Sequence, residues 1–148
     1  MTNIGLTPRD VARELARRYS TMTHDELDML EGILVPMKFQ KGEYILREGE
    51  VCKNIFWIVK GLVRQFYHKN GKELTEYMAT ENTICMAIES LFHEEPSKQQ
   101  IVALEPTIIY ALPKVALEQE AIKNVNIQML YRKILEESLI ISQKHADM

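Results

Sequence analysis

The spacing of apolar and polar positions changes twice along the chain and divides it into three zones. In the first zone, residues 1–32, apolar residues recur at helical spacing from Val11 to Tyr19. A second short helix is predicted to begin at Thr23, because Glu26 three residues later completes a capping box. We therefore expect two N-terminal helices.

The second zone, residues 33–112, consists of short runs rich in β-branched and aromatic residues, separated by turn signals at regular spacing. Asn70-Gly71 is the best of these signals, since both residues tolerate the positive φ of a tight type I′ hairpin. The pattern predicts an antiparallel double-stranded β-helix, or jelly roll, so that the chain as a whole is mainly β with flanking helices. Strands are expected at 34–39, 43–47, 54–60, 62–68, 73–79, 83–86, 98–105 and 107–112.

The third zone, residues 113–148, is predicted to be helical. Pro113 suits a helix start, and no Gly or Pro interrupts the chain from about Val125. Alternating three- and four-residue steps, typical of a coiled-coil seam, place in one stripe Ile127, Leu130, Ile134, Ser138 and Ile141. We favour a parallel homodimer through this stripe, because so long a terminal helix has little of its own domain to cover. The alternative is a helix that packs on its own β-roll.

Charge and composition exclude some classes of function. The net charge is −3, and no basic run is longer than Arg17-Arg18, so a nucleic-acid-binding surface is not expected. Cys52 and Cys85 form no CxxC pair and are interpreted as small buried residues. No segment is typical of a secretory signal or long enough to span a bilayer, so we expect a cytoplasmic protein without a membrane partner.

Two adjoining segments carry a family resemblance. Lys41–Glu50 resembles the GxxIxxxGE turn of cyclic nucleotide-binding domains, and Ile55–Arg64 resembles the hairpin that follows it in that family. Gly49 and Gly61 match the structural glycines of the family, and the tail Thr107–Lys114 also agrees. Over residues 20–146 the chain is similar to the sensor domain of Crp/Fnr-type transcription regulators. The resemblance implies one domain, residues 1–148, with a β-roll and a C-terminal dimerisation helix.

The resemblance does not extend to the chemistry that binds cyclic AMP. Family members that bind it use a glycine, a carboxylate for the ribose hydroxyl and an arginine for the cyclic phosphate. These positions hold Met86, Ala87 and Ser97 here, while the length of the segment is preserved. We therefore expect that cyclic AMP is not bound in the usual way, and that any ligand is apolar or amphipathic.

Other pocket candidates are Ile88, Glu89, Lys98 and the polar pair Ser142-Gln143, which falls where family members touch the base. Strand alternation predicts that Lys98 points away from the pocket. Family members have a short helix in this segment, and Glu89 could replace the missing carboxylate only by rotating around that helix. We favour Glu89 and Lys98 as solvated surface charges.

No cofactor is expected. The N-terminal cysteine cluster of iron–sulfur members is absent, and a lone His68 at a strand end is interpreted as a surface residue rather than a haem ligand. The chain has no HxH pattern for a cupin metal site and no nucleophile elbow or Walker loop, so an enzyme is not expected.

The expected function is ligand sensing by a regulatory domain of a Crp/Fnr-like regulator. DNA would be contacted only through a helix-turn-helix domain absent from this chain, which stops at Met148 near the end of the long helix. Whether the chain is a fragment or a stand-alone module stays open. The alternative function is a protein-interaction module that uses the β-roll as a scaffold.

Overall fold

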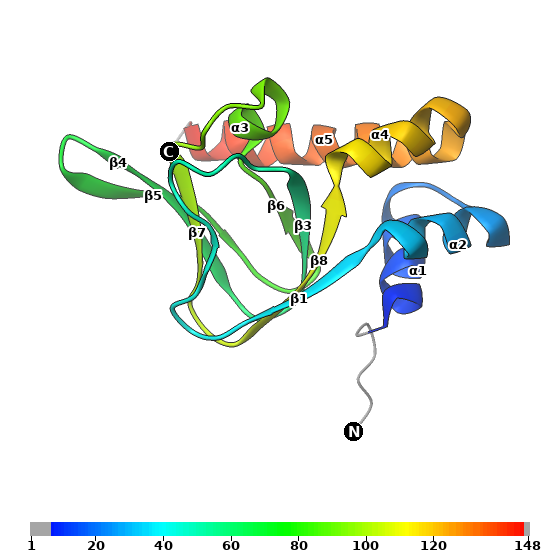
Figure 1. The fold of residues 1–148 in the computed structure, drawn as a ribbon, viewed down its shortest axis with the longest axis horizontal. Helices are drawn as coiled ribbons and strands as arrows, with labels where there is room; N and C mark the ends of the chain where they lie inside the picture. The colour runs from blue at the N-terminus through cyan, green and yellow to red at the C-terminus, as the bar shows by residue number, and fades with distance from the viewer. Residues whose placement is uncertain (1–6, 147–148) are drawn as a thin grey trace.

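The eight strands of the computed structural model, which describes residues 7–146, form two antiparallel four-stranded sheets that make up a roll (Figure 1). One sheet has the order β1 (Val35–Phe39), β8 (Thr107–Pro113), β3 (Asn54–Lys60) and β6 (Thr83–Cys85). The other has the order β2 (Tyr44–Leu46), β7 (Gln99–Ala103), β4 (Val63–Lys69) and β5 (Lys72–Ala79). The predicted fold class is confirmed, and every predicted strand lies within about two residues of an observed one.

Two turns show how local sequence sets the path of the chain. Asn70 and Gly71 adopt φ values of 55° and 77°, so the β4–β5 hairpin has the positive φ values that its sequence predicts. Gly61 has a φ of 116°, and a Cβ atom there would lie 2.3 Å from Oγ1 of Thr107. Only glycine allows the β3–β4 turn to approach the start of β8 this closely.

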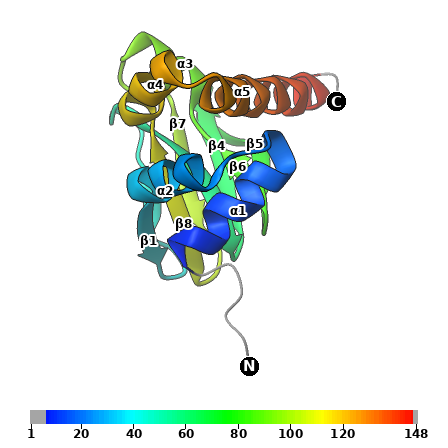
Figure 2. The same cartoon turned by 90° about the vertical axis from the view of Figure 1, so that its right-hand side faces the viewer.

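Five helices flank the roll: α1 (Pro8–Tyr19), α2 (His24–Ile33), α3 (Ile88–His93), α4 (Lys114–Lys123) and α5 (Val125–Ala146). The predicted capping box is confirmed, since the Glu26 amide donates to Thr23 Oγ1 at 3.2 Å and the Thr23 amide donates to Glu26 Oε1 at 2.7 Å. Figure 2 shows α1 and α2 against one side of the roll, with α5 crossing above α1. Within the described residues, no helix has the length and apolar composition that a bilayer span requires.

Strand β3 is buried on both of its faces. Ile55, Phe56, Trp57 and Ile58 are all at most 3 % exposed, whereas a strand at the surface of a roll buries only alternate residues. Helix α1 covers the outer face, where the guanidinium carbon of Arg18 lies 5.6 Å from the centre of the Trp57 ring. The N-terminal helices are therefore an integral part of the core.

The stripe predicted as a dimer seam is covered within the chain over its first half. Ile127, Leu130 and Ile134 are 0 % exposed, because α5 packs against α4 and α1. The assignment of these three residues to a dimer seam is therefore wrong, and the alternative of a helix packed on its own domain holds for them. Ser138 and Ile141, further along the helix, are partly exposed.

The opposite side of α5 carries exposed apolar residues. Met129 is 38 % exposed, and Leu139 and Ile140 are each 56 % exposed. Their spacing places them across the helix axis from the buried stripe. This outer face is therefore available for contact with a partner.

Neighbouring residues on α5 test this arrangement. Leu130→Ala leaves a cavity in the core and should lower the free energy of unfolding by about 2–5 kcal/mol. Met129→Ala, on the outer face, should change it by about 0.5 kcal/mol or less in the monomer. Urea denaturation of both variants measures the difference. Equal losses would show that α5 is not seated as described.

Candidate functional site

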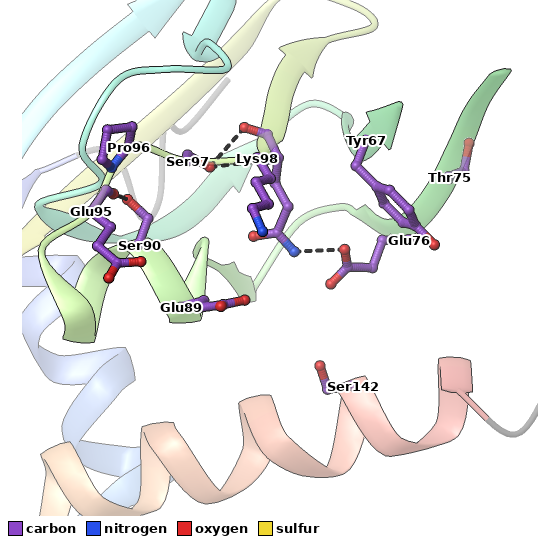
Figure 3. A pocket seen from close by; sticks show the side chains of 11 residues that line it. Tyr67, Thr75, Glu76, Glu89, Ser90, Glu95, Pro96, Ser97, Lys98 and Ser142 are labelled. Atoms are coloured by element: carbon purple, nitrogen blue, oxygen red, sulfur yellow. Dashed lines mark hydrogen bonds between the residues drawn. The ribbon is translucent and has the colours of Figure 1, made fainter. Parts of the chain in front are cut away.

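Two adjoining cavities lie between α3, the sheet that contains β4, β5 and β7, and helix α5. The polar lobe, shown in Figure 3, has a volume of about 470 Å³, and it is lined by Tyr67, Thr75, Glu76, Glu89, Ser90, Glu95, Pro96, Ser97, Lys98, Gln99 and Ser142. The apolar lobe has a volume of about 420 Å³. It shares four of these residues and adds Gln65, Tyr77, Ile84, Cys85, Met86, Ile88, Phe92, His93, Ser138, Leu139 and Ile141. Together they form a site with two chemically different halves.

The segment before α3 forms part of the apolar lobe. Met86 and Ile88 line it, and the Met86 carbonyl accepts a hydrogen bond of 3.0 Å from Nε2 of the buried Gln65. Ala87, the N-cap residue of α3, is 0 % exposed and is not among the lining residues. Of the three residues that the sequence predicts here, Met86 and Ile88 line the cavity, whereas Ala87 is buried and does not line it.

Ser97 and Ser90 use their hydroxyl groups within the fold. The Ser97 hydroxyl donates to the Gln99 carbonyl at 2.8 Å and accepts from the Gln99 amide at 3.0 Å. The Ser90 hydroxyl donates to the Glu95 carbonyl and accepts from the Cys52 amide at 2.9 Å. Because each hydroxyl has one proton, neither serine has a hydrogen left to donate to a ligand.

Glu89 and Lys98 are both exposed, and both line the polar lobe. The prediction that Lys98 points away from the pocket is wrong. Lys98 lies in a bend just before β7, so the alternation of a regular strand does not apply to its side chain. Both residues are exposed, as expected, but they also form part of the cavity wall.

Glu76 is a lining residue that the sequence does not reveal. In the pairing of β4 with β5, Gln65 faces Tyr77 and Phe66 faces Thr75, so that Glu76 is the extra residue of a β-bulge. A bulge changes the direction of side chains, and Thr75 and Glu76 both line the polar lobe although they are sequence neighbours. Gln99 Nε2 donates to Glu76 Oε2 at 2.6 Å across the lobe (Figure 3).

Helix α5 closes the cavity with residues from its second half. Ser142 lines both lobes, and Ser138 and Ile141 line the apolar lobe. Gln143 is exposed and is not among the lining residues, so the structure separates the predicted polar pair. The last two residues of the predicted seam therefore face the cavity.

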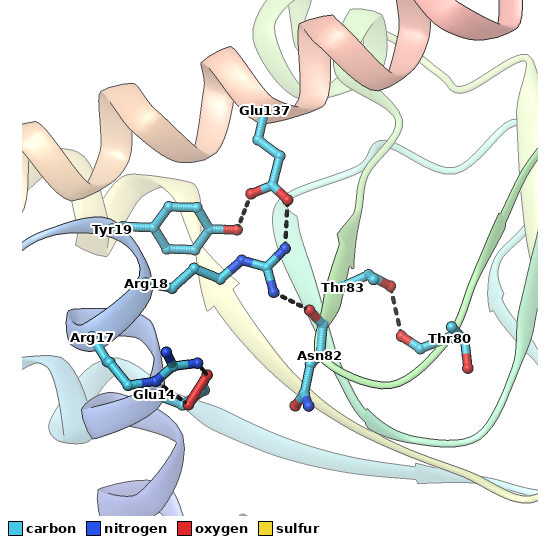
Figure 4. A network of polar contacts seen from close by, with 8 residues as sticks. All are labelled: Glu14, Arg17, Arg18, Tyr19, Thr80, Asn82, Thr83 and Glu137. Carbon is cyan, nitrogen blue, oxygen red and sulfur yellow. Dashed lines mark hydrogen bonds and ion pairs between the residues drawn. The ribbon is translucent and has the colours of Figure 1, made fainter.

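A cluster of polar contacts joins α5 to α1 (Figure 4). Arg18 Nη2 donates to Glu137 Oε1 at 2.7 Å, and the Tyr19 hydroxyl donates to Glu137 Oε2. Arg18 Nη1 also donates to the carbonyl of Asn82 at 2.6 Å, so one guanidinium ties α1 to α5 and to the β5–β6 turn. Burial and the Glu137 carboxylate both raise the pKa of the Tyr19 phenol. We call Arg18, Tyr19 and Glu137 the clasp.

Among the side chains of residues 7–144, no three His, Cys, Asp or Glu groups are arranged to hold a metal ion. His68 lies on β4, with ring nitrogens 3.6 Å from carboxylate oxygens of Glu48 and Glu73. The free thiols of Cys52 and Cys85 are buried, and burial raises the pKa of each.

Comparison with known families returned one match. The model of the cyclic nucleotide-binding domain matches residues 36–124, which include β1 to α4 and thus most of the cavity wall. A search of curated protein sequences returned no significant match.

Solved structures with the same fold include several regulators. A cyclic nucleotide-binding domain from Methylobacillus flagellatus has a TM-score of 0.75 at 16 % identity, over 93 % of this chain and 83 % of that one. The catabolite activator protein of Thermus thermophilus has a TM-score of 0.70 at 19 % identity, over 90 % of this chain but only 62 % of that one. The sensor domain of the transcriptional regulator DNR from Pseudomonas aeruginosa has a TM-score of 0.69 at 16 % identity, over 86 % and 92 %.

The clasp can be tested with adjacent glutamates. Glu137→Gln removes the charge that Arg18 and Tyr19 both contact, and should lower the free energy of unfolding by about 1–2 kcal/mol. Glu136→Gln, which disrupts only an exposed pair with Arg132, should cost less than about 0.5 kcal/mol. Urea denaturation at neutral pH compares the two. If Glu137→Gln is as stable as Glu136→Gln, the clasp does not hold α5.

Proposed function

We propose, since the chain belongs to the cyclic nucleotide-binding domain family, that it is the ligand-sensing regulatory domain of a Crp/Fnr-like transcription regulator, with a ligand other than a cyclic nucleotide. The observation that carries this proposal is the composition of the two-lobed cavity. It lies where the resemblance places the ligand, yet its wall holds Met86 at the position of the family's glycine and Ser97 at the position of its phosphate-binding arginine.

A cyclic phosphate needs hydrogen-bond donors and positive charge around it. Among the described residues of the cavity wall, Lys98 is the only cationic side chain, while Glu76, Glu89 and Glu95 line the same lobe. The buried Ser97 hydroxyl donates its hydrogen to the backbone and cannot replace an arginine. The electrostatics of the lobe therefore disfavour an anion.

Calorimetry tests this part of the proposal. Cyclic AMP and cyclic GMP should bind no more tightly than about millimolar, because at least two charge-assisted contacts, worth about 1.5–3 kcal/mol each, are missing. A protein that binds cyclic AMP at micromolar concentration serves as the positive control. A micromolar dissociation constant for either nucleotide would refute the claim.

The proposed domain works as a homodimer through the outer face of α5. This face carries Met129, Leu139 and Ile140, whose exposed apolar surface a second copy would cover. In a two-fold symmetric dimer each of these positions occurs twice in the interface, so its apolar contribution is doubled. DNA contact belongs, in this proposal, to a separate helix-turn-helix domain, on which the sensor acts through α5.

A single charge on the outer face should separate the copies. Ile140→Glu places a carboxylate against its symmetry mate and should yield a monomer in sedimentation at micromolar concentration. The fold should persist, because Ile140 is 56 % exposed within the chain and lines neither lobe of the cavity. Ile134→Glu is unsuitable, since it would put a charge in the core.

Val35→Glu is the matched control, because Val35 is a comparably exposed apolar residue on β1, away from α5 (Figure 1). It should leave the dimer intact. A wild-type monomer at these concentrations, or an Ile140→Glu dimer, would contradict the proposed interface.

A further inference from the structure

We infer that the apolar lobe takes an uncharged, mainly aliphatic ligand with a hydroxyl group, and that this hydroxyl donates a hydrogen bond to Oε1 of Gln65. The inference rests on the proposed function, since it concerns the same cavity, and it adds the polar group that the ligand carries. It follows from one buried side chain whose hydrogen bonds are only partly made within the chain.

Gln65 is a polar residue at a core position of β4. It is 4 % exposed, and in the pairing of β4 with β7 it lies opposite the buried Ile101. Its neighbour Arg64 instead forms an ion pair with the exposed Glu73. An apolar side chain would fill the core position without loss, whereas a buried amide is favourable only when its polar atoms have partners.

The Gln65 amide finds a partner within the chain for its nitrogen but not for its oxygen. Nε2 donates to the Met86 carbonyl at 3.0 Å, and this bond identifies the nitrogen end of the amide, because a carbonyl only accepts. Among the described residues, no donor forms a hydrogen bond with Oε1.

The unpaired oxygen opens into the apolar lobe. Every side-chain oxygen or nitrogen of the described residues that is sealed from solvent has a hydrogen-bond partner, so the unpaired Oε1 of Gln65 is not sealed. Gln65 is buried and, of the two lobes, lines only the apolar one. This lobe is therefore the space from which a donor can reach Oε1.

The wall around Gln65 suits a hydrocarbon body. Its apolar members are Ile84, Met86, Ile88, Phe92, Leu139 and Ile141. Phe92 is 37 % exposed, and covering such surface with an aliphatic ligand removes apolar area from water, which favours binding. A charged group would lose its hydration beside this wall, so we infer an uncharged ligand.

A hydroxyl group matches what the Gln65 amide leaves open. Its hydrogen is donated to Oε1, and its oxygen can accept the second hydrogen of Nε2 or that of Ser138, which lines the same lobe. A ketone of the same shape accepts but cannot donate, so it leaves Oε1 without a partner.

Cyclooctanol and cyclooctanone have the same carbon skeleton and differ in whether they can donate a hydrogen bond. Binding of each is followed by NMR of the Met86 methyl group, whose signal is assigned from its loss in Met86→Leu. Cyclooctanol should bind about fivefold more tightly than cyclooctanone, because one hydrogen bond between uncharged groups contributes roughly that factor.

Variants of the lobe identify the group responsible. In Gln65→Met, which removes the amide and keeps the length of the side chain, the preference for cyclooctanol should disappear while cyclooctanone binds as before. Ser138→Ala is the matched control, since it removes a hydroxyl from the same lobe, and it should keep the fivefold preference.

The wild-type protein gives a second readout that does not depend on the stability of a variant. The Nε2 hydrogens of Gln65, assigned through bonds in labelled protein, should shift more with cyclooctanol than with cyclooctanone. Equal shifts would contradict a hydrogen bond to this amide.

The outcomes separate this inference from the proposed function. If both probes shift the Met86 signal and bind equally tightly, the hydroxyl is wrong, while the lobe remains a ligand site. If Gln65→Met keeps the preference, or Ser138→Ala abolishes it, Gln65 does not select the ligand and the inference also fails. If neither probe shifts the Met86 signal, both the inference and the ligand-sensing function are overturned.

Discussion

The burial of one stripe of α5 in the core of its own chain is the constraint on which the other features depend. With Ile127, Leu130 and Ile134 fixed against α4 and α1, the rotation of the helix about its axis is set. Ser138, Ile141 and Ser142 must then face the cavity, and Leu139 and Ile140 must have substantial exposed surface. The packing of this stripe thus determines which residues of α5 line the cavity and which remain exposed for a partner.

The charge of the cavity wall follows from a few of its side chains. The Ser97 hydroxyl forms its hydrogen bonds with the backbone of Gln99, so no charged group is buried at this position. Glu76, Glu89 and Glu95 line the same lobe as a single lysine, Lys98. Among the described residues, the polar lobe therefore has more negative than positive side chains.

Local sequence signals predicted most of the fold. Strand alternation, the positive-φ hairpin residues Asn70-Gly71 and the capping box at Thr23 depend on interactions within a few residues, and all three are confirmed. The three- and four-residue spacing on α5 correctly predicted a helix with an apolar face. It could not tell whether that face is covered by a second copy or by α1 and α4, because both neighbours demand the same pattern.

The cavity was less predictable than the fold for reasons of backbone geometry. Met86 and Ile88 line it as expected, but Lys98 does so because a bend replaces the regular strand before β7. Glu76 enters the wall through a β-bulge, which inserts one residue without any mark in the sequence. The clasp joins Arg18 to Glu137, and such long-range pairs leave no periodic signal. The wide separation of Arg18 and Glu137 along the sequence also has a kinetic consequence. The two residues are 119 positions apart, so forming their contact before the intervening strands have folded would require closing a long loop. We therefore expect α5 to dock onto α1 late in folding, so that weakening this contact accelerates unfolding more than it slows refolding.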